Sequence, residues 1–163
     1  MSKADLRVLL ACGGLLLSLS QSGRADVNVT IRGTVVAPPS CSINRGATLN
    51  VDFGDNLTVG GIDGVNYRRE VPYTVTCVNH PSNSMTLKLT GTAAPFEATA
   101  LTTNHRDLGI RLYINDVAWP INTAVNFTYP TLPRMEAVPV KNPRRRLQGG
   151  VFAATATLVV EMR

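Results

Sequence analysis

Apolar and polar residues alternate along this chain in many short runs, and no stretch keeps a 3.6-residue apolar period over three helical turns. Alternation of this kind places every second side chain on one face of an extended strand, so the pattern indicates half-buried β-strands. Turn-forming pairs such as Pro38-Pro39, Gly60-Gly61 and Asp63-Gly64 separate the runs. The predicted strands cover residues 26–36, 48–53, 69–78, 85–90, 108–115, 118–121, 124–128, 135–140 and 151–162. The sequence therefore predicts an all-β fold, and so many short strands favour an immunoglobulin-like sandwich.

The N-terminus has the three parts of a secretory signal peptide. Lys3 and Arg7 are positive, residues 8–19 form an apolar run of about a dozen residues, and Gly23-Arg24-Ala25 is a small-x-small cleavage site. The apolar run is shorter than the about 20 residues that span a bilayer. Residues 9–12 faintly resemble a lipoprotein site, but cleavage there would leave almost no apolar run before Cys12. We therefore expect residues 1–25 to be removed and the protein to be exported.

Removing residues 1–25 changes the cysteine count from three to two, Cys41 and Cys77. Two cysteines in a chain sent to an oxidising compartment favour one disulfide, although two unpaired structural thiols are the alternative. Removal also leaves 13 basic and 10 acidic residues. That balance is too mild to indicate a nucleic-acid partner, because such partners need basic charge concentrated on one face.

Two amphipathic segments of similar pattern lie at opposite ends of the mature chain. In the first, apolar residues alternate with Asn28, Thr30, Arg32 and Thr34, and Pro38-Pro39 separates this segment from the rest of the chain. The second runs through residues 151–162 to the end of the chain, so no further strand comes after it. A complete seven-stranded sandwich needs one more strand there. The leading segment could fold back to supply that strand, or it could fill the gap of another molecule. The stiff Pro38-Pro39 pair favours the second arrangement.

The mature chain resembles the pilins of chaperone–usher pili, and among them the minor tip adaptors of P-type pili. The motifs that carry the resemblance occur in the family's order along the whole mature chain. They are Asp26-Val27, Ile31-Arg32-Gly33, Pro38-Pro39-Ser40-Cys41-Ser42-Ile43-Asn44, Val51-Asp52-Phe53-Gly54, Cys77, Lys88-Leu89-Thr90-Gly91, Leu108-Gly109-Ile110-Arg111-Leu112-Tyr113 and Gly149-Gly150-Val151-Phe152.

This resemblance implies an incomplete immunoglobulin-like domain, residues 38–163, that lacks its seventh strand, with residues 26–37 as an N-terminal donor-strand extension. It implies that a periplasmic chaperone first fills the open groove, and that the next subunit's leading strand replaces the chaperone at an outer-membrane usher. The expected partners are thus the chaperone, the usher and neighbouring subunits, among them a tip adhesin. The expected location is the cell-surface fimbrium.

The resemblance also assigns residues to these roles. The donor positions are Val27, Val29, Ile31, Gly33 and Val35, with Gly33 where only a missing side chain fits the groove. The strand that contacts the chaperone and borders the groove carries Gly150, Phe152, Ala154, Ala156, Leu158, Val160 and Met162. The family usually has Tyr or Phe at the penultimate position, and Met162 is apolar and adaptable enough to replace them.

No catalytic, metal-binding or cofactor-binding pattern accompanies these segments. His80 lies in a turn and His105 in a polar loop, so both are expected to be ordinary surface residues. The run Arg144-Arg145-Arg146 is interpreted either as a solvated loop or as a contact for acidic groups of a partner. The rival interpretation is a self-contained secreted β-sandwich that binds a carbohydrate or protein. Its expected aromatic site is not evident, because aromatic residues make up only 6% of the chain and Trp119 is the single tryptophan.

Overall fold

A computed structural model describes residue 24 and residues 26–163, so the predicted signal peptide lies almost wholly outside the described residues. The chain divides into two units, Met1–Val35 and Val36–Arg163. The first unit, as far as it is described, contains no strand or helix. None of the described helices is both long and apolar enough to cross a membrane.

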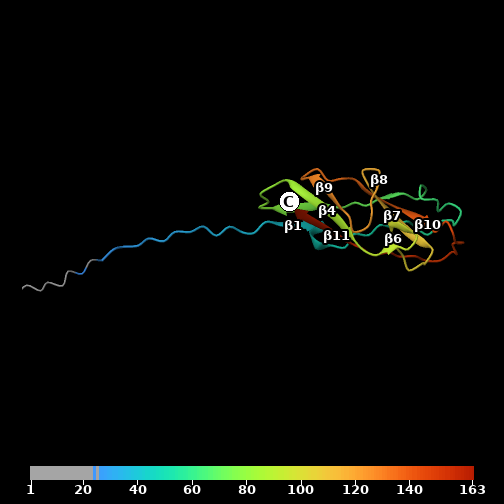
Figure 1. The fold of residues 1–163 in the computed structure, drawn as a ribbon, viewed down its shortest axis with the longest axis horizontal. Coiled ribbons are helices and arrows are strands. Elements are labelled where there is room, and N and C mark those ends of the chain that lie inside the picture. Colours follow the sequence, from blue (N-terminus) through green and yellow to red (C-terminus); the bar gives the residue numbers. More distant parts are fainter. Residues whose placement is uncertain (1–23, 25) are drawn as a thin grey trace, which may run out of the picture. The chain divides into compact units, whose positions relative to one another are not determined.

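The second unit is built from short strands and one 3₁₀ turn, η1 (Asn44–Gly46) (Figure 1). The strands are β1 (Ser40–Ile43), β2 (Arg69–Glu70), β3 (Val75–Val78), β4 (Ser84–Thr90), β5 (Ala93–Ala94), β6 (Glu97–Thr102), β7 (Leu108–Ile114), β8 (Val117–Ala118), β9 (Ala124–Thr128), β10 (Met135–Lys141) and β11 (Thr157–Met162). Every strand pair is antiparallel. The all-β prediction is confirmed.

The strands form three sheets. The largest has the order β2-β10-β7-β6-β5, with β8 paired to β7, and a second has the order β11-β4-β9. The third contains only β1 and β3, in a register that places Cys41 opposite Cys77.

The core lies between the two larger sheets. Leu87 and Leu89 of β4 pack in one cluster with Leu112 of β7 and Met135 of β10. Trp119 belongs to the same cluster, is 5% exposed, and donates its indole N–H to the carbonyl oxygen of Thr123 at 2.9 Å. Because side chains of both sheets interdigitate there, the arrangement is a sandwich.

β10 is buried on both faces, unlike a strand in a sheet that has one solvent-exposed face. Val138 and Val140 form a second cluster with Ala94 and Ala100. Nearby, the loop glycine Gly64 is so close that a Cβ there would lie 3.2 Å from Val140. The loop before β2 therefore covers part of the outer face, and a near-continuous apolar run such as that of β10 is typical of such burial.

The strand predictions differ from the structure in several regions, and of the predicted strand 118–121 only Ala118 belongs to one, β8. β1, β5 and β6 were not predicted. In β6 the alternating Ala and Thr give little apolar contrast between the two faces. The predicted strand 69–78 is interrupted between β2 and β3, and only the second half of 151–162 is a strand. Residues 26–36 and 48–53 belong to no strand. Leu49, Val51 and Phe53 of the latter nevertheless pack on the core, so what this segment lacks is a paired neighbour.

Candidate functional site

A groove of about 1070 Å³ opens onto the hydrophobic core of the second unit. One rim is the segment 47–57 and the other is the segment 150–158, both contributing most of their residues to the lining. The floor consists of Val71, Leu89, Leu101, Ile110, Leu112, Met135 and Ala137, all of them members of the main core cluster. The groove therefore reaches the main core cluster between two segments that lie mostly outside any strand, and its floor residues are themselves buried.

The two rims meet through an aromatic contact. Phe53 of the first rim and Phe152 of the second have ring centroids 6.0 Å apart at an angle of 44°. Tilted ring pairs at this distance stabilise a fold by more than the burial of their apolar surface alone. The charged side chains on the lining are Asp52 and Asp55, both exposed on the first rim. The groove thus has an apolar interior and a polar edge.

The C-terminal strand brings most of its predicted site residues to this groove. Gly150, Phe152, Ala154, Ala156 and Leu158 line it. Val160 and Met162 do not line it, and pack instead near the disulfide with Met85. Leu158, Val160 and Met162 lie opposite Leu89, Leu87 and Met85 in the pairing of β11 with β4. The seven positions therefore divide between the groove and the end of the sandwich.

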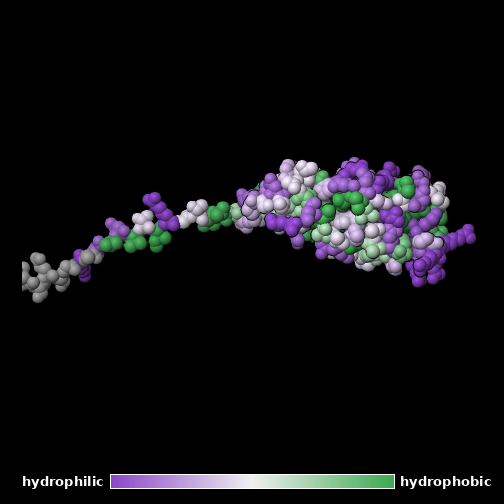
Figure 2. All heavy atoms as spheres, turned by 45° about the horizontal axis from the view of Figure 1, so that its top comes forward, coloured by the Kyte–Doolittle hydropathy of each residue, from purple (hydrophilic) through white to green (hydrophobic). Residues whose placement is uncertain are grey.

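The predicted donor residues lie in the first unit with their side chains exposed. The exposed fractions are 80% for Val27, 77% for Val29, 90% for Ile31 and 99% for Val35. A Cβ added to Gly33 would meet no atom within 4 Å. Figure 2 shows apolar residues, in green, along this segment. Nothing in the fold of this segment itself requires a glycine at position 33.

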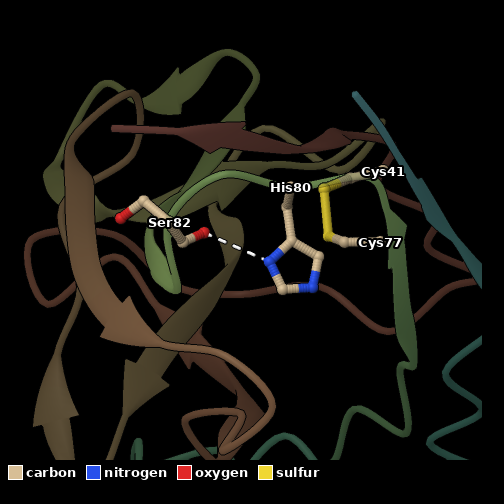
Figure 3. Close-up of a disulfide and its surroundings, with 4 residues drawn as sticks. All are labelled: Cys41, Cys77, His80 and Ser82. Carbon is tan, nitrogen blue, oxygen red and sulfur yellow. Dashed lines mark hydrogen bonds between the residues drawn. A yellow bond between two sulfur atoms is a disulfide. The ribbon is translucent and has the colours of Figure 1, made fainter. Parts of the chain in front are cut away.

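Cys41 and Cys77 form a disulfide, as the sequence predicted. The sulfur atoms of Cys41 and Cys77 are bonded, and the bridge joins β1 to β3 (Figure 3). The His80 ring lies beside the bridge, with Nδ1 3.3 Å from the carbonyl oxygen of Ser82.

The histidines are more enclosed than the sequence suggested. His80 is half-buried and packs edge-on to Tyr129, with ring centroids 5.1 Å apart. His105 is also half-buried and lies near Gly150 at the end of the second rim. Within residues 24 and 26–163, no three His, Cys, Asp or Glu side chains are grouped so as to hold a metal ion. Arg144, Arg145 and Arg146 are exposed, as the solvated-loop interpretation requires.

Tyr73, which packs on the main core cluster, is a partly buried polar residue with a hydrogen-bond partner. Its hydroxyl donates to the carbonyl oxygen of Pro133 at 2.7 Å, and burial raises the pKa of Tyr73 to about 12. The phenol therefore stays neutral and serves as a structural link between segments.

Sequence reasoning did not identify the first rim or the floor. The alternation of Leu49, Val51 and Phe53 was visible, but it indicated an ordinary paired strand. The floor residues come from five separate parts of the chain, so no local motif could have grouped them.

The antiparallel β-sandwich of this domain is the fold of solved pilus subunits. Residues 29–163 match the family model described as "Fimbrial protein", and the chain belongs to this family, the pilins of chaperone–usher pili. It is a subunit of a cell-surface pilus and interacts with other subunits of that pilus.

Known proteins agree with this assignment. The chain is 39% identical over 153 residues to the fimbrial-like protein YfcQ of Escherichia coli strain K12, covering 90% of this chain and 94% of YfcQ. It is 34% identical over 157 residues to the fimbrial adapter PapF of Escherichia coli, covering 88% and 92%. The solved structure of PapF, described as the P pilus adaptor subunit, aligns with a TM-score of 0.54 at 25% identity over 76% of this chain and 95% of PapF. The P pilus rod subunit PapA, at 19% identity, shares the fold with a TM-score of 0.66 over 76% of this chain and 99% of PapA.

Proposed function

We propose that the protein polymerises by donor-strand exchange, in which residues 26–37 fill the groove of one neighbour and its own groove accepts the leading strand of another. The observation that carries this proposal is the groove, whose floor is the domain's own hydrophobic core. An exposed core beside an unpaired strand edge is an aggregation hazard unless a further strand covers it. Addition of a strand provides backbone hydrogen bonds and also fills the pockets with alternate side chains.

The leading segment has the chemistry of such an added strand. Val27, Val29, Ile31 and Val35 fall on one face at every second or fourth residue and are almost fully exposed. Burying four such side chains contributes about 6–12 kcal/mol before the cost of ordering the strand. Gly33 lies on the same face, and its own segment does not need a glycine there, because an added Cβ would meet no atom within 4 Å. We assign it to a part of the neighbour's groove that leaves no room for a side chain.

The test is thermal unfolding of residues 26–163, alone and with a second copy of residues 26–37 linked after Arg163. We expect a large rise of the unfolding midpoint in the linked protein. A matched control carries Val29→Asp and Ile31→Asp in the added copy only, which leaves the linker and length unchanged and should abolish the rise. If the unlinked protein is stable and the unlinked, linked and control proteins share one unfolding midpoint, the sandwich is complete. That result would favour the rival interpretation, a ligand-binding β-sandwich.

Within the pilus, we propose the position of a minor adaptor near the tip, joining a tip adhesin to the next type of subunit. The identity with the fimbrial adapter PapF over most of both chains supports this position. Reconstitution with purified chaperone and usher tests it. An adaptor should enter fibres only when other subunits are supplied, whereas long fibres of this subunit alone would identify a rod subunit.

We further propose that the chain reaches the pilus through the periplasm, after removal of residues 1–25 and in complex with a chaperone that covers the groove. The apolar groove supports this route, because an uncovered groove would aggregate. Mass spectrometry of the periplasmic protein should find Asp26 as the first residue. Recovery as a soluble, chaperone-free monomer in good yield would argue against the chaperone.

A further inference from the structure

The second rim of the groove is extended but is not part of a strand ladder in its first half. The pairing of β11 with β4 begins at Thr157, and residues 151–156 carry no strand pairing. Instead, the described hydrogen bonds to this half come from a single residue of the loop between β6 and β7, Asn104. The Asn104 side-chain oxygen accepts the N–H of Ala153 at 2.7 Å, and the Asn104 N–H donates to the carbonyl oxygen of Ala153 at 3.1 Å. The Asn104 side-chain nitrogen lies 3.4 Å from the carbonyl oxygen of Val151.

These bonds determine which backbone groups remain free. In an extended strand, the N–H and C=O of consecutive residues point alternately to the two edges. Val151 and Ala153 direct theirs toward Asn104, so Phe152 and Ala154 direct theirs toward the opposite edge. The described part of the chain offers no backbone hydrogen bond to Phe152 or Ala154, and both residues line the groove. Asn104 therefore leaves a row of unpaired groups facing the groove.

The loop that carries Asn104 is itself held in place. The Thr103 hydroxyl lies 2.9 Å and 3.0 Å from the carbonyl oxygens of His105 and Leu108, and it accepts the N–H of His105 at 2.9 Å. Leu108 is buried in a cluster with Ile62 and Leu147, on which Phe152 also packs. Asn104 is exposed, so its amide serves this contact without being required by the core.

We propose that Asn104 is a positioning residue for strand addition, which keeps residues 150–154 extended and their free edge aimed into the groove before a donor strand arrives. This inference rests on the proposed donor-strand function. Without the Asn104 amide, the rim would have to be ordered during binding, and ordering costs conformational entropy. The Asn104 amide should thus affect how fast a donor is captured, and should affect much less how fast a captured donor leaves.

The experiment uses mature residues 26–163 and a fluorescent synthetic peptide of residues 26–37 as the donor probe, with association and dissociation measured separately. Loss of the amide in Asn104→Ala is expected to slow association by about tenfold, with dissociation changed by less than about twofold. Asn104→Asp keeps the acceptor for the Ala153 N–H, so its association rate should lie between those of Asn104→Ala and wild type. The matched control, Asn66→Ala, removes an exposed side chain that donates to the Asp63 carboxylate at 2.8 Å in the loop before β2, away from the groove lining and from the Asn104 loop, and should bind the peptide like wild type.

Hydrogen–deuterium exchange of residues 150–156 distinguishes positioning from a general loss of stability. In Asn104→Ala, exchange should become faster in these residues of the donor-free protein and not in β7 or β10. Equal association rates for Asn104→Ala and wild type would overturn the inference while leaving donor-strand exchange intact. Equally accelerated exchange throughout the domain would also overturn it, in favour of a structural role. Failure of the wild-type protein to bind the peptide at all would overturn both this inference and the proposed acceptor groove.

Discussion

Replacing Leu112 by alanine should destabilise the domain by different amounts with and without a strand in the groove. Leu112 is 4% exposed, belongs to the main core cluster and forms part of the groove floor. The substitution removes three carbon atoms from a buried position. At about 0.8 kcal/mol for each, the lost transfer free energy is about 2.4 kcal/mol.

A second contribution to the lost stability depends on whether the space vacated by the Leu112 side chain is enclosed. In the donor-free domain, this space opens into the groove and water can enter, so we expect a loss of about 2.5 kcal/mol in the free energy of unfolding. A donor strand would seal the space as a cavity, and the cost should approach the upper part of the range of about 2.7–5.0 kcal/mol seen for buried Leu→Ala changes. We therefore expect the cost to be about 1–2 kcal/mol larger in the protein with the linked donor strand.

The assay is urea unfolding followed by the fluorescence of Trp119, the single tryptophan, in the linked and unlinked proteins. Val138→Ala is the matched control, because Val138 is 0% exposed and belongs to the cluster away from the groove. Its cost should be the same in both proteins. If Leu112→Ala also costs the same in both, the added strand does not close over the floor, and the reasoning fails.

Three further predictions concern the rest of the domain. Replacing Cys41 and Cys77 by alanine should cost about 4 kcal/mol, because the bridge closes a loop with a sequence separation of 36; urea unfolding under oxidising conditions that shows no loss would contradict a contribution from the bridge. The Arg111 guanidinium, together with the Thr99 hydroxyl, holds the pKa of Glu97 below its ordinary value of 4.5. The ionised Glu97 carboxylate therefore contributes its full stabilisation of the fold above about pH 4.5, and this stabilisation is lost as the pH falls through the lower pKa of the folded state. Glu97→Gln should therefore be less stable than wild type at pH 7, with the difference shrinking in acid; a difference that is constant from pH 7 to pH 3 would refute this. Gly64→Ala should lose about 1–3 kcal/mol, because φ is +83° and the new Cβ would lie 2.8 Å from the Arg111 side chain; an unchanged unfolding midpoint would show that the loop adapts freely.

The sequence predicted the parts of the fold that local patterning determines. β7, β9 and β10 were found nearly to the residue, because strong apolar runs are bounded there by turn residues. β6 was missed because alternating Ala and Thr give little contrast between its two faces. Cysteine count predicted the disulfide without any geometry.

The site was less accessible to such reasoning. The alternation of Phe152, Ala154 and Leu158 predicted a strand, and the resemblance to pilins assigned it to the groove. Residues 150–156, however, have the local pattern of a strand without a paired neighbour. Pairing depends on what lies beside a segment, and the sequence of the segment carries no information about an absent neighbour. Asn104 lies in a polar loop, where the sequence gives no reason to assign one asparagine a special role. Only its hydrogen bonds to Ala153 in the structure distinguish it.

The position of the disulfide also has a mechanical consequence. The leading segment continues through Pro38 and Pro39 into β1, where Cys41 is bonded to Cys77. If that segment forms the joint to the next subunit, as proposed above, tension along a fibre enters the domain at β1. The sheet of β1 and β3 pairs only four residues of each strand, and such a ribbon is weak on its own. The covalent bond passes the load directly to β3, so pulling cannot unzip β1 from the domain one hydrogen bond at a time.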